Sequence, residues 1–252
     1  MKSIDLNCDM GEMREAIADG TQESLMPHLT SVNVACGGHA GDESTMAATI
    51  QQALLWKLAI GAHPGYADRA NFGRIELEIS REAVTESVFL QVQALAEIAE
   101  GLGARLAHVK PHGALYNQAV HNRGLAAAIA KGVARSSKSV TLVGLAGSSM
   151  LDVFQEAGFA VAAEAFADRR YEPDGTLRSR KFDDALIRDP EAAARQAISI
   201  AQHGTVIASD GSEIPVHAQT ICLHSDTPGA AQIAKAVAGG LRQAGVLLKA
   251  VS

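Results

Sequence analysis

Several side chains that could carry out chemistry sit just beyond short apolar runs. His39, His63, Lys110 and His112 each follow such a run, and Asp9 follows the first one along the chain. Polar groups at the carboxyl ends of successive strands are how an α/β barrel assembles one active site from many loops. The pattern therefore indicates an enzyme.

Three of these residues offer the donor atoms of a divalent-metal site. A carboxylate and two imidazoles form a common catalytic ligand set, so Asp9, His63 and His112 are candidate metal ligands. They come from three separate segments, so no local spacing supports a metal site. The alternative is that each is a polar side chain that only hydrogen-bonds to the backbone of its own loop. Lys110 and His112 would share one face if the strand continues through them. In a partly desolvated pocket both would have depressed pKa values suited to proton transfer or oxyanion stabilisation; at an open loop they would simply be solvated.

The first apolar run carries polar residues on alternate positions. Asp5, Asn7 and Asp9 would point to one face of a strand, with Leu6 and Cys8 on the other. Burying such groups unpaired costs several kcal/mol, on the order of 2–7 for each. Either a metal or substrate site or a hydrogen-bond network with neighbouring strands would account for them.

A second group of charged residues follows the sixth strand-like run. Glu164, Asp168, Arg169 and Arg170 lie there, and an arginine could clamp a carboxylate or phosphate through its planar fork. A surface ion-pair network is the alternative. His224, after the seventh run, is a further candidate.

Bulk composition excludes some classes of protein. The 252 residues carry a net charge of −6 and only 4% aromatic residues, which argues against a nucleic-acid binder. No apolar run is long enough to span a membrane, and no signal peptide precedes the first strand-like run, so we expect a cytoplasmic protein. The three cysteines are expected to be buried free thiols. The chain has no Walker-type phosphate loop and so no evident means of binding ATP alone.

The elements that must position these residues alternate between strand and helix. Short runs rich in Val, Ile, Leu and Ala predict seven buried parallel strands. They lie near residues 4–8, 32–36, 58–62, 105–109, 140–144, 160–164 and 220–224. Polar residues after at least four strands favour a closed (β/α) barrel over an open sheet, and seven units indicate a variant of the eightfold barrel. We expect a single domain over residues 1–252, helix caps at Asp42, Ser80 and Asp189, and a long, locally positive loop over 165–189.

Taken together, these segments resemble the LamB/YcsF family of lactam-utilisation proteins. The resemblance rests on Ile-Asp-Leu-Asn-Cys-Asp-Met-Gly-Glu at 4–12, Gly-Ala-His-Pro-Gly-Tyr at 61–66 and Lys-Pro-His-Gly-Ala-Leu-Tyr-Asn at 110–117. It continues through residues 35–42, 143–148, 164–175 and 221–230, and so covers nearly the whole chain.

The resemblance implies a seven-stranded, TIM-like barrel similar to glycoside hydrolase and polysaccharide deacetylase barrels. It also implies ATP-dependent hydrolytic opening of 5-oxoproline to glutamate, shared with two partner subunits that would bind the ATP. On this hypothesis Asp9 or His63 positions or deprotonates water, Lys110 and His112 stabilise developing charge, and Arg170 holds the substrate carboxylate. The remaining candidate substrate contacts are Asn7, His39, Tyr116, Glu164 and Asp168.

Two rival functions stay open at this point. A stand-alone metal-dependent deacetylase or amidohydrolase would use the same barrel mouth without ATP. A non-catalytic assembly subunit would bind the partners and tolerate loss of the histidines. The sequence does not decide between a monomer and a homo-oligomer.

Overall fold

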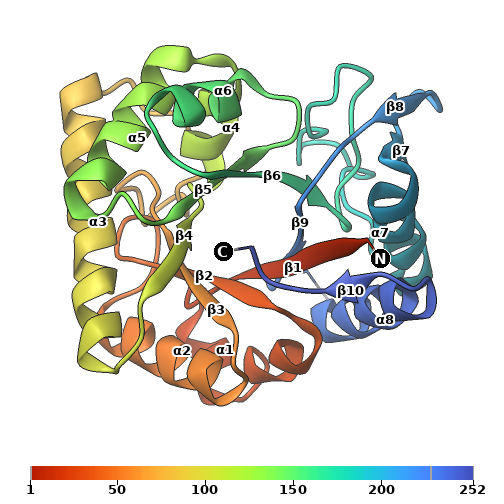
Figure 1. Ribbon diagram of the computed structural model, residues 1–252, viewed down its shortest axis with the longest axis horizontal. Helices are drawn as coiled ribbons and strands as arrows, with labels where there is room; N and C mark the ends of the chain where they lie inside the picture. The colour runs from red at the N-terminus through yellow and green to blue at the C-terminus, as the bar shows by residue number, and fades with distance from the viewer. Residues whose placement is uncertain (1, 228, 252) are drawn as a thin grey trace.

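Seven parallel strands close into a barrel in the computed structural model, which describes residues 2–227 and 229–251. They are β1 (Ser3–Met10), β2 (Ser31–Ala35), β3 (Ala59–His63), β4 (Leu106–Val109), β5 (Thr141–Leu145), β6 (Val161–Phe166) and β9 (Thr220–His224). Closure comes from β1, which pairs in parallel with both β2 and β9 (Figure 1). The predicted seven-stranded (β/α) barrel is confirmed.

Helices surround the barrel on its outside (Figure 1). They are α1 (Arg14–Ala18), the 3₁₀ helix η1 (Glu23–His28), α2 (Glu43–Leu55), α3 (Arg81–Gly101), α4 (Gly113–His121), α5 (Arg123–Ser136), α6 (Ser149–Glu156), α7 (Pro190–His203) and α8 (Ala230–Gln243). The side chains of Asp42, Ser80 and Asp189 accept hydrogen bonds from the first turns of α2, α3 and α7, as predicted. Within the two described stretches, no helix is both long and apolar enough to cross a membrane.

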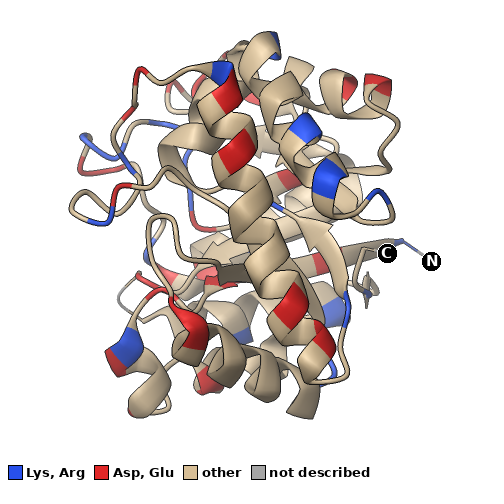
Figure 2. Ribbon diagram, turned by 90° about the vertical axis from the view of Figure 1, so that its left-hand side faces the viewer, with Lys and Arg blue, Asp and Glu red and all other residues tan. Residues whose placement is uncertain are grey.

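Charges of both signs are interspersed over the helices on the side of the molecule formed by α3 and α5 (Figure 2). Arg135 of α5 pairs with Glu86 of α3, and its guanidinium also lies 4.0 Å from the centre of the Phe89 ring. The side chains of this ion pair are about half exposed, so the pair contributes little to stability. The three cysteines, Cys8, Cys36 and Cys222, are buried and free, as expected.

Three short strands were not predicted. β7 (Thr205–Ile207) and β8 (Glu213–Pro215) form an antiparallel hairpin, and β10 (Leu247–Leu248) pairs with the start of β1. Each is two or three residues long, too short to show a hydrophobic period. The hairpin did have a local signal, because Asp210-Gly211 is a favoured turn pair and Gly211 has a φ of +88°.

The inside of the barrel is filled by a hydrogen-bonded polar network. Asp5 accepts bonds from Thr30, Ser31 and Thr220, and all of these partners lie on strands adjacent to β1 or at their starts. The Asn7 amide donates to Glu164 at 3.1 Å and to Thr220. Hydrogen bonds to neighbouring strands, rather than a metal or substrate site, therefore account for the polar side chains of Asp5 and Asn7 on this strand. Asn7 lies beneath the cavity described below and holds Glu164, so the structure does not place it as a substrate contact.

Candidate functional site

A cavity of about 620 Å³ opens at the carboxyl ends of the strands. The loops after β1, β3, β4, β6 and β9 all contribute to it, which is the arrangement expected for an active site in this architecture. Its lining includes Asp9, Glu12, His63, Arg74, Lys110, His112, Tyr116, Phe166, Arg169, Arg180, Lys181, His224 and Asp226.

His63 and His112 face each other at the base of the cavity, with Nε2 of His63 3.0 Å from Nδ1 of His112. The outer nitrogen of each ring is fixed by a backbone carbonyl: Nδ1 of His63 lies 2.7 Å from the Lys110 oxygen and Nε2 of His112 lies 2.9 Å from the Phe72 oxygen. A carbonyl only accepts, so these outer nitrogens carry the protons. The two facing nitrogens then present lone pairs, and a shared proton or a cation between them relieves their repulsion.

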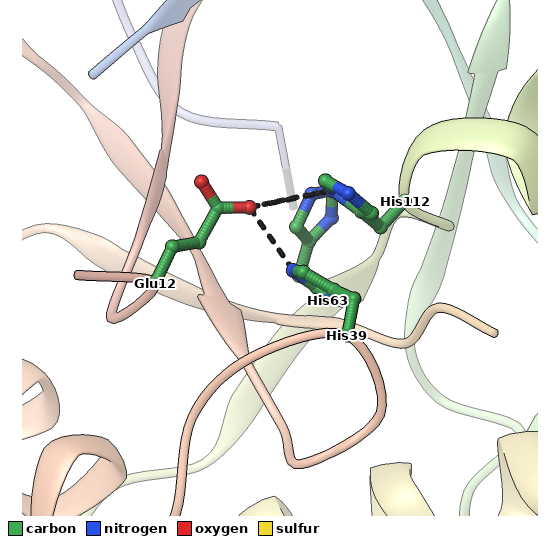
Figure 3. Close-up of side chains that lie close together, drawn as sticks. All are labelled: Glu12, His39, His63 and His112. Atoms are coloured by element: carbon green, nitrogen blue, oxygen red, sulfur yellow. Dashed lines mark hydrogen bonds and ion pairs between the residues drawn. The ribbon is translucent and has the colours of Figure 1, made fainter. Parts of the chain in front are cut away.

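Glu12 closes this site and was not among the predicted site residues. Its Oε1 lies 3.0 Å from Nε2 of His39, 3.3 Å from Nδ1 of His112 and 3.9 Å from Nε2 of His63 (Figure 3). Burial raises the pKa of Glu12 even though His112 attracts its charge. The sequence held one clue, because a glycine, Gly11, follows the first strand. In the structure Gly11 takes a φ of +76°, which turns the chain so that the next residue lies over the barrel mouth.

His39 lies behind the cavity rather than in it. Its ring stacks on His112 at a centroid distance of 3.5 Å and an interplanar angle of 4°, and Nε2 bonds Glu12. Burial, with a smaller effect from His63, lowers the pKa of His39 to about 2. A Cβ on Gly65 would come within 2.7 Å of Nδ1 of His39, so glycine permits this close packing. His39 therefore orients Glu12 and His112 and is not placed to touch a substrate.

Asp9 and Lys110 form a buried ion pair beside the histidines. Lys110 Nζ lies 2.9 Å from Asp9 Oδ1, 3.1 Å from Glu164 Oε1 and 3.0 Å from Cys222 Sγ. The prediction of a depressed lysine pKa is wrong: burial does favour the neutral amine, but Asp9 and the other anionic partners raise the pKa of Lys110 well above its usual range. All three ammonium protons have partners within the barrel. Lys110 therefore neutralises the buried carboxylates beside it and is not available to transfer a proton.

Asp9 also faces the histidine pair. Its Oδ2 lies 3.3 Å from Nε2 of His63, and Oδ1 accepts a second bond, from Asn33, at 2.8 Å. Burial opposes ionisation of Asp9, but His63 and Lys110 outweigh it and hold the pKa of the carboxyl well below its usual range. A permanently charged carboxylate beside an imidazole stabilises the imidazolium that forms when His63 takes up a proton.

We expect His108 to make the fold acid-sensitive. Its ring lies inside the barrel with Nε2 2.7 Å from Asn33 Oδ1, and burial, together with Lys110, lowers its pKa from 6.5 to about 3. Between these values the unfolded chain binds a proton that the folded chain does not, so the free energy of unfolding should fall by about 1.4 kcal/mol per pH unit on acidification. Urea denaturation at pH 6, 5 and 4 measures this slope. His108→Gln should make it shallower by that amount, and an unchanged slope would contradict the assignment.

The residues after β6 divide between the cavity and the surface. Both Asp168 oxygens accept from His224, from its backbone N–H at 2.9 Å and from Nδ1 at 3.0 Å, so Asp168 orients His224 instead of lining the cavity. Arg170 is exposed and lies outside the cavity, so the predicted carboxylate clamp is not at this position. Its neighbour Arg169 lines the cavity instead. Tyr116, a predicted substrate contact, also lines it.

The family model described as LamB/YcsF matches residues 4–252. The chain belongs to the LamB/YcsF family. A family relative from Chloroflexus aggregans, named as one of the subunits of 5-oxoprolinase, is 49% identical over 249 residues, with 99% of each chain covered. The crystal structure of the lactam utilization protein from Thermus thermophilus superposes with a TM-score of 0.91 at 40% identity, covering 98% of this LamB/YcsF chain and 99% of that one.

The fold of this LamB/YcsF chain is also similar to that of more distant proteins. A family 4 carbohydrate esterase from Streptomyces lividans, in complex with acetate, superposes with a TM-score of 0.54 at 11% identity, covering 100% of this chain and 93% of the esterase. That likeness concerns the barrel alone.

Proposed function

We propose that this chain is the ring-opening subunit of an ATP-dependent 5-oxoprolinase, which hydrolyses 5-oxo-L-proline to L-glutamate together with two partner subunits. The observation that carries the proposal is the facing pair of His63 and His112 nitrogens, 3.0 Å apart at the base of a cavity and flanked by Asp9 and Glu12. Support for the substrate class comes from the name that the relatives carry and from the lactam utilization protein of similar structure.

ATP has a chemical reason to take part. A five-membered lactam is a stable amide, and a phosphoryl group on its oxygen makes the ring carbon more electrophilic. The partners would supply this group, since the sequence lacks a Walker-type phosphate loop. This chain would then direct water at the activated carbon.

The side chains supply the proton transfers that such a hydrolysis needs. As the water oxygen bonds to the ring carbon, one water proton passes into the gap between the facing nitrogens of His63 and His112, and Asp9 stabilises the resulting cation. The carbon–nitrogen bond then breaks as the added hydroxyl becomes the acyl carbonyl, and the ring nitrogen takes up both water protons, one from the histidine pair and one from the hydroxyl. An acyl phosphate remains, and a second water completes its hydrolysis to glutamate and phosphate.

The test is glutamate release from 5-oxoproline and ATP by this chain alone, by the two partner subunits alone and by all three together. We expect release only from the complete mixture. Release without ATP by the isolated chain would instead support the amidohydrolase. Full activity of a complete mixture that contains His112→Ala would support the non-catalytic assembly role.

A divalent metal is a second candidate for what lies between the histidines. One donor atom each from Glu12, His39, His63 and His112 lies within 4.8 Å of the others, and a tetrahedral zinc site needs donors roughly 3.3 Å apart. The parallel rings of His39 and His112 cannot both aim an in-plane lone pair at one ion, so Glu12, His63 and His112 would hold it, with Asp9 beside them. A bound metal would lower the pKa of a coordinated water.

Metal binding to the isolated chain can be measured directly. If an ion belongs to the site, equilibrium dialysis against Zn²⁺ or Mn²⁺ should give one tightly held ion per chain, and His63→Gln should abolish it because one of three ligands is lost. His203→Gln is the control, since His203 is exposed at the end of α7. Failure of the unmodified chain to retain either ion would rule out these ligands.

A further inference from the structure

Arg169 is a buried cation without a carboxylate partner. The residue is only 7% exposed, and within residues 2–227 and 229–251 no carboxylate oxygen lies within 4.0 Å of its guanidinium. One amino group, Nη2, donates to the Arg178 carbonyl at 2.7 Å, while Nε has no hydrogen-bond partner. The adjacent Asp168 is directed toward His224 instead, and its two oxygens accept from the backbone N–H and Nδ1 of that residue.

A buried charge of this kind needs an anion. Removing a guanidinium from water without a paired carboxylate or full hydrogen bonding is costly, and burial, with a contribution from Arg180, lowers the pKa of Arg169 to about 10. Arg169 lines the cavity, so the missing anion can be supplied by a ligand there. A guanidinium is also the side chain best shaped to bind the two oxygens of a carboxylate.

The cavity lining carries charges of both signs. Asp9 and Glu12 contribute carboxylates beside the histidines. Arg180, which lies near enough to lower the pKa of Arg169, shares a single carboxylate, that of Asp226, with Arg74, so two guanidinium groups there have one carboxylate between them. An anionic group on a substrate is therefore repelled by Asp9 and Glu12 and attracted to Arg169 and Arg180.

Aromatic side chains give the cavity an apolar surface as well. Phe166, at the end of β6, stacks on His224 at 5.6 Å between centroids and meets Tyr116 edge-on at 6.2 Å. All three side chains line the cavity. The flat ring of Phe166 is a suitable contact for the methylene carbons of a small lactam.

We propose that Arg169 binds the carboxylate of the lactam substrate and thereby directs the ring amide toward Glu12, His63 and His112. This assignment rests on the proposed function for the identity of the substrate, and it makes Arg169 the residue that distinguishes 5-oxoproline from a lactam without a carboxylate. The ligand class is a compact cyclic amide with one carboxylate next to the ring nitrogen.

Calorimetry on the full chain tests the proposal with two ligands that share one ring. 5-Oxo-L-proline carries the carboxylate and 2-pyrrolidinone lacks it. The unmodified chain should bind 5-oxoproline at least about tenfold more tightly, as expected for a charge-assisted bidentate contact. Arg169→Gln should remove this preference, and Arg170→Gln, a matched change at the exposed neighbour, should keep it.

Several results would overturn the assignment. They are equal affinity of the unmodified chain for the two lactams, no binding of 5-oxoproline, and a preference that survives in Arg169→Gln. Inorganic phosphate is the third probe: if it binds through Arg169 and 5-oxoproline does not, the site takes a phosphoryl group and the carboxylate assignment fails. If Arg169→Gln does not fold by circular dichroism, Arg169→Lys keeps the charge but loses the fork, and should reduce the preference.

Kinetics of the reconstituted three-subunit mixture separate this proposal from the proposed function. Arg169→Gln should raise KM for 5-oxoproline at least about tenfold, with a much smaller change in kcat, because a carboxylate contact is made in ground and transition states alike. Unchanged KM in an active mixture would refute the role of Arg169 alone. An inactive unmodified mixture, with the calorimetric preference intact, would refute the proposed function alone.

Discussion

Replacing His112 by glutamine is expected to lower kcat for glutamate release by about 10²–10⁴-fold, the usual contribution of a positioned general acid–base. Glutamine keeps a polar side chain but cannot offer the basic nitrogen that lies 3.0 Å from His63. The pair would lose one of its two facing nitrogens, so the proton released by water could no longer be held between them. Steady-state assays with both partner subunits and saturating ATP measure the effect.

The control for this substitution is His203→Gln, which makes the same chemical change on the exposed end of α7 and should leave kcat unaltered. KM is informative as well: His112 acts on the reacting atoms, so its loss should appear mainly in kcat. Near-normal turnover by His112→Gln, in a mixture whose folding is verified, would remove His112 from the mechanism.

The substitution Lys110→Met is expected to destabilise the fold by about 3–5 kcal/mol, the usual result of removing one partner from a buried ion pair. Lys110 is 2% exposed and lies between Asp9 and Glu164, which would be left as two buried carboxylates without a cation. Methionine keeps most of the length and apolar volume of lysine, so the loss reports on charge rather than packing. Urea denaturation followed by circular dichroism gives the free energy of unfolding.

A double substitution checks the reason for this loss. Glu164→Gln removes one of the two uncompensated charges, so Lys110→Met with Glu164→Gln should recover part of the stability lost in Lys110→Met alone. If the losses simply add, the two residues are not coupled, and the charge-balance role of Lys110 fails.

Most of the barrel could be predicted from the sequence because its signals are local. Seven buried strands leave short apolar runs, and helix starts such as Asp189-Pro190 carry their own capping chemistry. The grouping of His63, His112 and Asp9 at one end also followed, because parallel strands bring their carboxyl ends to the same rim.

What could not be predicted depends on the direction of side chains beyond strand ends. Alternation stops where a strand stops, so nothing in the sequence distinguished the buried Arg169 from the exposed Arg170. The pKa of Lys110 was predicted in the wrong direction because burial was weighed without Asp9 and Glu164, which lie on other strands and become its neighbours only through the fold. Glu12 was missed for a similar reason, since its place depends on the turn at Gly11.

The contact that closes the barrel joins distant parts of the chain: the Thr220 hydroxyl on β9 bonds Asp5 on β1, 215 positions away. Contacts of such long range are slow to form during folding because a long loop must first be closed. Until β9 docks, β1 and β6 remain open edges and Asp5 lacks one of its partners. A partly folded chain thus has no finished pocket, and its two bare edges are sites where another chain can add a strand and start aggregation.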